Sequence, residues 1–162
     1  MSRAHEAFLQ AVNNVAGVNG SYLINNRGEV LMSLSQQRTS PDADAQLALR
    51  MVQMLAALEM VEGSAEEITL QFEQGLVTLY ASLGLLLETK YGVEEVFLAV
   101  ITNPKANLSM LRMTMKVAAT KLKGEPSVRG LAVSAQVDRR NLLQRNYLDE
   151  AGLEMVKALV RA

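Results

Sequence analysis

The chain is organised around residues 96–124, VFLAVITNPKANLSMLRMTMKVAATKLKG. The first six residues of this stretch are all apolar, a pattern typical of a strand that is buried on both faces in the middle of a sheet. Asn103-Pro104 ends the strand, because proline has no N–H to donate to a neighbouring strand, and Asn107 is suited to cap a helix. Apolar residues then recur at helical spacing as far as Gly124. We therefore expect a central strand, a tight turn and an amphipathic helix that folds back onto the sheet.

The sequence before this stretch predicts two helices and four strands. Asn25-Asn26-Arg27-Gly28 separates two short apolar runs and suits the positive φ angles of a hairpin turn. Ser40-Pro41-Asp42 is a typical helix start, and Gly63 a typical helix end. The expected elements are a helix over 3–16, strands over 21–25 and 29–35, a helix over 41–62, and strands over 68–73 and 76–81.

Two further segments complete the expected order. Residues 83–95 either extend the fourth strand or form an inserted apolar loop before the central strand. Residues 125–127 are interpreted as a linker, and Asp149-Glu150 as the start of a last helix with Met155, Val156 and Leu159 on one side. The prediction is an α+β domain over residues 1–124 with the order αββαβββα, followed by a C-terminal extension, 125–162, that contains a terminal helix.

The helix expected over 41–62 has more apolar surface than one contact needs. One stripe comprises Leu47, Met51, Met54, Leu55 and Leu58, and a second comprises Ala45, Ala48, Leu49, Val52, Ala56 and Met60. A helix needs only one stripe to cover a sheet, so the second indicates another buried contact. We interpret that contact as the same helix in a second copy of the chain.

Composition excludes several classes of function. Sixteen basic and seventeen acidic residues leave a net charge of −1, so neither a basic face for nucleic acid nor a polybasic membrane anchor is expected. The chain has no cysteine, which excludes disulfides and thiol catalysis. The first fifteen residues lack the apolar core of a signal peptide, and no segment is long and apolar enough for membrane insertion. We expect a cytoplasmic protein.

No constellation of catalytic residues is visible. His5 is the only histidine, and we expect it to be a solvated surface residue because no nucleophile or second ligand accompanies it. The carboxylate pairs Glu66-Glu67, Glu94-Glu95 and Asp149-Glu150 are interpreted as charges at the ends of elements. Gly17 and Gly20 lack the lysine and hydroxyl partners of a phosphate-binding loop. We expect no enzymatic activity, no catalytic residue, no cofactor and no metal.

The residues ANLSMLR at 106–112, after an apolar strand, resemble the Roadblock family of dynein light chains and bacterial GTPase regulators. The same family is resembled by the turn Asn26-Arg27-Gly28 followed by EVLMS, and by the position of the long helix from Pro41. The resemblance as a whole covers residues 4–123. The resemblance implies a five-stranded antiparallel sheet in a profilin-like sandwich. A long helix lies on one face of that sheet, and the N- and C-terminal helices lie on the other. Residues 83–91 are longer than the family's usual connection, and the C-terminal extension is placed like the tail of bacterial polarity regulators.

The resemblance also implies how copies associate. In the family, two copies pair through the second helix and the third strand. In this chain the corresponding dimer-interface residues are Met51, Met54, Leu55, Leu58, Ile68, Leu70 and Phe72. On the last family helix, Met110, Met113 and Val117 lie away from the core-facing positions, and we expect them to bind a partner.

Family members act as platforms for Ras-like small GTPases or as subunits of motor and signalling assemblies. We therefore expect a non-enzymatic, homodimeric module that regulates or scaffolds a small GTPase. A purely structural subunit with no effect on nucleotide turnover is the alternative, and LGLLL at 83–87 prompts a third, a sensor for a small hydrophobic ligand. Arg112, Arg139 and Arg140 are candidates for an arginine finger, but we favour their interpretation as surface charges.

Overall fold

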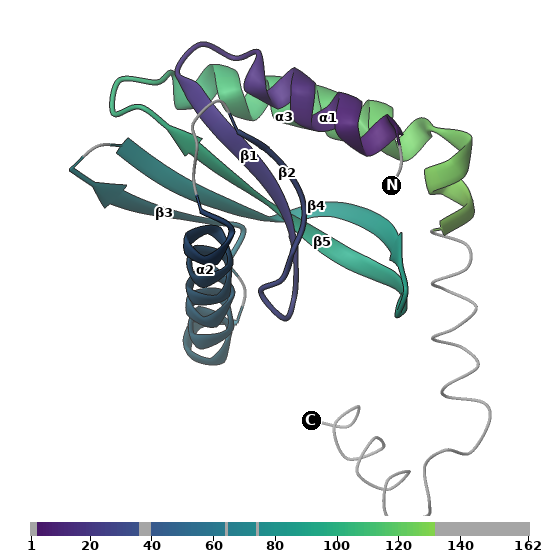
Figure 1. Ribbon diagram of the computed structural model, residues 1–162, viewed down its shortest axis with the longest axis horizontal. Helices are drawn as coiled ribbons and strands as arrows, with labels where there is room; N and C mark the ends of the chain where they lie inside the picture. The colour runs from purple at the N-terminus through teal and green to yellow at the C-terminus, as the bar shows by residue number, and fades with distance from the viewer. Residues whose placement is uncertain (1–2, 36–39, 64, 74, 132–162) are drawn as a thin grey trace, which may run out of the picture.

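The computed structural model describes residues 3–35, 40–63, 65–73 and 75–131, and it contains three long helices and five strands (Figure 1). The elements are α1 (Arg3–Asn13), β1 (Val18–Asn25), β2 (Val30–Ser35), α2 (Pro41–Glu62), β3 (Glu67–Phe72), β4 (Gly75–Thr89), β5 (Gly92–Thr102) and α3 (Leu108–Gly124). This order confirms the predicted αββαβββα arrangement.

The strands form one antiparallel sheet in the order β2-β1-β5-β4-β3. β5 lies in the middle, which confirms the central strand predicted from its apolar run. Its side chains alternate between the two faces: Val96, Leu98 and Val100 join one core cluster, and Ala99 joins the other. A strand in the middle of a sheet with helices on both faces is buried on both sides, so its sequence shows no polar alternation.

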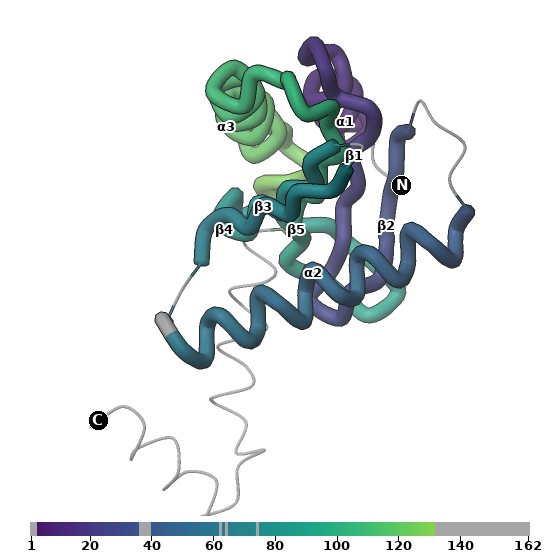
Figure 2. Tube along the Cα trace, turned by 90° about the vertical axis from the view of Figure 1, so that its left-hand side faces the viewer, coloured from purple at the N-terminus to yellow at the C-terminus, as the bar shows by residue number. Residues whose placement is uncertain are grey.

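The two faces of the sheet are covered differently. α1 and α3 lie side by side over one face, whereas α2 alone crosses the other (Figures 1 and 2). The predicted helix caps are present, because the side chain of Asn107 accepts a hydrogen bond from the N–H of Met110 at 3.1 Å, and that of Ser40 accepts one from Ala43 at 3.1 Å.

Residues 83–89 extend the fourth strand, and after a turn residues 92–95 begin β5, so the segment does not form an inserted loop. β4 changes register between Tyr80 and Leu85, where Gly84 takes a φ of +65°, and then continues as a two-stranded ribbon with β5. Leu83, Leu85 and Leu87 are buried in the core on the side of α1 and α3. Packing in this core accounts for the apolar run LGLLL without a bound ligand.

The chain beyond α3 continues as helix. After a bend at Glu125, residues 126–131 are helical, and Val128 is buried in the core on the side of α1 and α3. The segment interpreted as a linker therefore leads directly into packed structure. The helix predicted to start at Asp149-Glu150 lies outside the described residues.

Candidate interaction surfaces

α2 leaves much of its apolar surface uncovered. The sheet buries Ala48, Met51, Val52 and Leu55. These four residues come from both of the stripes that the sequence predicts, so the helix rests on the sheet along a line between them. From residue 56 to residue 61 every side chain is exposed, and Met60 and Val61 are 89% and 82% exposed. Figure 2 shows the C-terminal end of α2 farther from the strands than its middle.

The predicted dimer-interface residues fall into two groups. Met51, Leu55 and Ile68 are buried by the chain's own core. Met54 and Leu58 are 37% and 38% exposed on α2. Met54 and Leu58 are therefore available for contact with a second copy, and the buried group supports them from beneath.

The edge strand β3 supplies the rest of that predicted surface. β3 is outermost in the sheet, and within the described part of the chain no strand pairs with its outer side. Leu70 is half-buried against the core below α2, and Phe72, at the end of the strand, is 50% exposed. An edge strand offers unpaired backbone N–H and C=O groups to another strand.

A second apolar surface lies on the opposite side of the molecule. Met110, Met113 and Val117 are 55%, 71% and 70% exposed and follow one another at helical spacing on α3. The core-facing side of the same helix is formed by Leu111, Met115, Ala119 and Leu122. We call the three exposed residues the outer face of α3.

Arg112 on α3 is held by an ion pair. Its Nη2 lies 2.9 Å from Oε1 of Glu67 on β3, and its Nε donates to Oε2 of the same carboxylate at 3.1 Å. The hydrogen bond to Glu67 raises the pKa of Arg112. This two-point pairing fits the preferred surface-charge interpretation of Arg112. Arg139 and Arg140 lie outside the described residues.

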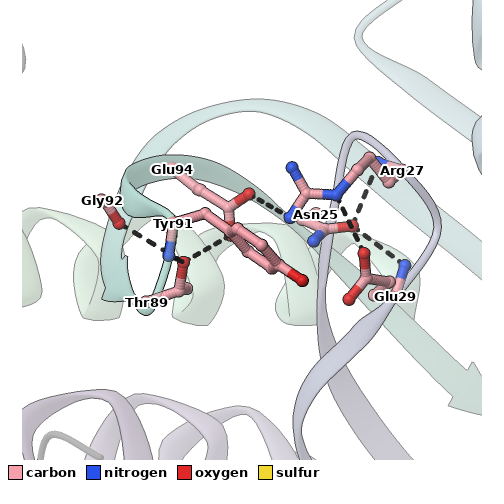
Figure 3. Close-up of polar contacts among 7 residues, drawn as sticks. All are labelled: Asn25, Arg27, Glu29, Thr89, Tyr91, Gly92 and Glu94. Atoms are coloured by element: carbon pink, nitrogen blue, oxygen red, sulfur yellow. Dashed lines mark hydrogen bonds and ion pairs between the residues drawn. The ribbon is translucent and has the colours of Figure 1, made fainter.

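The β1–β2 turn and the tip of the β4–β5 ribbon meet in a polar cluster that sequence reasoning missed (Figure 3). The Arg27 guanidinium donates to Oε1 of Glu29 at 2.8 Å, forms an ion pair with Glu94, and lies 4.8 Å from the centre of the Tyr91 ring. The Glu94 side chain is only 11% exposed, and a carboxylate with so little exposure is costly to leave without a partner. The cluster ties the ribbon to the turn.

The turn itself is shaped by Asn25, whose side-chain oxygen accepts the backbone N–H groups of Arg27 at 3.0 Å and Glu29 at 2.9 Å. The bond to Arg27 lowers the pKa of Glu29. At the tip of the β4–β5 ribbon, the Thr89 hydroxyl donates a hydrogen bond to Oε2 of Glu94 at 2.9 Å. The Asn-Arg-Gly sequence predicted the turn, but nothing in the sequence predicted its partner.

His5 corrects another prediction, because it is fully buried and not solvated. Its Nε2 lies 2.8 Å from the carbonyl oxygen of Leu86 on β4, and since a carbonyl only accepts, Nε2 carries the hydrogen. Nδ1 is buried without a partner. Burial lowers the pKa of His5, and the hydrogen bond to Leu86 opposes this in part. The spacing of His5 from Phe8 and Leu9 places all three on the core-facing side of α1.

Two kinds of site are absent from the described part of the chain. No group of three histidine, aspartate or glutamate side chains there is placed to hold a metal ion. None of the helices in those ranges combines the length and the apolar character required to cross a membrane.

Comparisons with known proteins complete these observations. No family model matches the chain. The uncharacterized protein MJ0714 of Methanocaldococcus jannaschii is 32% identical over 116 residues, which cover 71% of this chain and 90% of that protein. The solved Roadblock/LC7 domain from Streptomyces avermitilis is 13% identical with a TM-score of 0.54, covering 72% of this chain and 92% of the domain. A structure of MglB with a tetrameric arrangement is 20% identical with a TM-score of 0.58. The match covers 75% of this chain and 89% of the MglB chain.

Proposed function

Because the chain belongs to the same family as MJ0714 of Methanocaldococcus jannaschii and has the fold of Roadblock/LC7 domains, we propose that it is a non-enzymatic, homodimeric interaction module that regulates or scaffolds a Ras-like small GTPase in the cytoplasm. The observation that carries this proposal is the apolar surface of α2 and β3 that the single chain leaves uncovered. Met54, Leu58 and Phe72 belong to it.

Self-association is the first step of the proposal. Pairing of α2 with α2 and of β3 with β3 from two copies covers the exposed end of α2 and satisfies the open edge of the sheet at the same time. The tetrameric arrangement of the similar MglB structure is consistent with a fold that associates with itself. Met51, Leu55 and Ile68 then support the interface from within each copy.

A charged substitution on α2 tests this step. Met54→Asp places a carboxylate in the interface without a partner, which costs about 3–5 kcal/mol and therefore raises the dimer dissociation constant by on the order of a hundredfold or more. Met54 is the better choice than Leu55, because Leu55 is 3% exposed and its replacement would damage the fold itself. Sedimentation velocity measures the outcome.

The matched control is Met113→Asp on the outer face of α3, which is more exposed than Met54 and distant from α2. We expect this variant to sediment like the parent chain. Dissociation by both variants, or by neither, would contradict an interface on α2.

Recruitment of a GTPase is the second step. We place its contact on the outer face of α3, because Met110, Met113 and Val117 are apolar, exposed and not needed by the core. Since Glu67 already occupies the guanidinium of Arg112, any stimulation of hydrolysis works by ordering the loops of the GTPase itself.

The test of this step is to combine the purified chain with purified Ras-like small GTPases of the same organism and to measure both binding and GTP turnover. We expect a complex in the GTP state, a changed rate of hydrolysis, and loss of both in Met113→Asp. A stable complex without any change in turnover would favour the purely structural subunit. No complex with any such GTPase would contradict the proposal.

A further inference from the structure

The outer face of α3 lies in a basic setting. Within Leu108–Gly124 the charged residues are Arg112, Lys116, Lys121 and Lys123, and no acidic residue occurs. Glu67 neutralises Arg112, whereas Lys116 and Lys121 are exposed beside the apolar residues. Lys121 follows Val117 by one helical turn. The occupant that suits this face has an apolar stripe accompanied by carboxylates.

A small hollow adjoins the same face. It has a volume of about 100 Å³ and lies between α1 and α3. On one side it is lined by the small side chains of Ala7 and Ala11, and on the other by Ala118 and Lys121, which follow Val117 by one residue and by one helical turn. Glu125 adds one carboxylate to the same lining. An apolar side chain of an occupant therefore has a place to enter between the two helices.

The chain itself contains a segment with the matching pattern. Residues 149–162, DEAGLEMVKALVRA, begin with two carboxylates and carry a third at Glu154. Read as a helix, the segment has Leu153, Val156 and Val160 along one side, whereas Glu154 and Ala158 fall on the opposite side.

We propose that residues 149–162 dock on the outer face of α3 of their own chain. The apolar side chains of the segment cover Met110, Met113 and Val117, and the carboxylates of Asp149 and Glu150 at its start lie near Lys116 and Lys121. The docking itself does not require a GTPase. Only its consequence, that the tail competes with a partner for this face, rests on the proposed function.

The geometry of the connection permits this docking. The last described residue, Leu131, lies just beyond the C-terminal end of α3, and the seventeen residues 132–148 separate it from the segment. Seventeen residues span at most about 55 Å, more than twice the roughly 25 Å length of α3. Tethering on so short a connection keeps the segment at a high effective concentration, so a weak contact is sufficient.

A paramagnetic label tests the proposal in the full chain. Since the chain has no cysteine, Ala158→Cys gives a single site for a nitroxide on the polar side of the segment. The methionine methyl groups are the NMR reporters. We expect the Met110 and Met113 signals to lose most of their intensity relative to the reduced label, whereas the signal of Met60, which is 89% exposed at the far end of α2, is retained.

Two further samples separate docking from random encounters of a tail. Adding Val156→Asp to the labelled chain should restore the Met110 and Met113 signals, because it removes the apolar contact outside the folded domain. Diluting the labelled chain into an excess of isotopically silent chain without cysteine should leave the signal loss unchanged, because the contact is within one chain. Unaffected Met110 and Met113 signals, a loss that persists in Val156→Asp, or an equal loss at Met60 would overturn the proposal.

Discussion

The two faces of the sheet differ in how completely the chain covers them. On one face α1 and α3 lie side by side and share a continuous core with β5 and the β4–β5 ribbon. On the other face α2 lies alone and is buried only between Ala48 and Leu55. In its last turn Met60 and Val61 are almost fully exposed.

This difference separates folding from association. The face under α1 and α3, which we call the two-helix face, is covered, so its buried apolar residues stabilise the single chain, and the outer face of α3 with the adjoining hollow remains for other contacts. The one-helix face is open at the end of α2 and at the β3 edge, so its remaining apolar surface is available for an assembly. Substitutions on the two faces should therefore affect different measurements.

The largest effect is expected from breaking the core of the two-helix face. Leu111→Ala removes a side chain that is 1% exposed and leaves a cavity beneath α3, so we expect the free energy of unfolding to fall by about 2–5 kcal/mol. Urea denaturation measures the change. Met113→Ala on the same helix is the control, and its effect should stay within about 0.5 kcal/mol. Equal losses would mean that the outer face of α3 is already packed.

The next effect concerns how α2 is attached to the one-helix face. Gly28 has a φ of +80°, and a Cβ there would lie 2.6 Å from the Cα of Leu49 on α2. Gly28→Ala should therefore cost the roughly 1–2 kcal/mol of a left-handed residue and, in addition, displace α2. Gly92 also has a positive φ, +103°, but no atom within 4 Å of such a Cβ.

The comparison of Gly28→Ala with Gly92→Ala in urea denaturation isolates the contact with α2. We expect the Gly28 variant to be the less stable of the two and to dimerise more weakly. An equal loss of unfolding free energy in both variants would contradict the close contact between Gly28 and Leu49 on α2.

A smaller effect concerns the pH dependence of the two-helix face. Burial lowers the pKa of His5 below its usual 6.5, so the unfolded chain binds more protons than the folded chain as the pH falls below 6.5. The stability that neutral His5 provides is complete above pH 6.5 and is lost as the pH falls toward the lowered pKa. Denaturation between pH 7.5 and pH 5.5 should show this decline.

His5→Gln identifies the source of that decline, because His5 is the only histidine of the chain. The variant retains an N–H donor for Leu86 and should show almost no pH dependence over the same range. A decline of equal slope in His5→Gln would assign it to other groups.

The smallest effect is expected at the edge where the two faces meet. The ion pair between Arg112 and Glu67 is partly exposed, so a double-mutant cycle with Arg112→Gln and Glu67→Gln should give only a weak coupling that disappears in high salt. A strong coupling at high salt would indicate that α3 is held to β3 by this pair more than by its core contacts.

Most of the fold could be predicted from the sequence because most elements have their own local signal. An unbroken apolar run identified β5, Asn107 and Ser40 identified helix starts, and Asn25-Asn26-Arg27-Gly28 identified the first hairpin. These signals act over a few residues, so they can be read without knowing where the rest of the chain lies.

The contacts that sequence analysis missed depend on distant segments. Arg27 meets Glu94 because β1 pairs with β5, with Asn25 opposite Val96, so that the first turn lies beside the start of β5. His5 could have been assigned to the core from its spacing relative to Phe8 and Leu9, but the absence of a nucleophile or second ligand beside it led to the prediction of a solvated position. The periodicity of α2 showed an excess of apolar surface, but it could not show that the uncovered part lies at the C-terminal end.

Sedimentation equilibrium of the full chain at micromolar concentration tests most directly whether the open face of α2 and β3 serves self-association. We predict the mass of two chains, which falls to the mass of one in Met54→Asp. A single-chain mass for the parent protein over the whole micromolar range would contradict it.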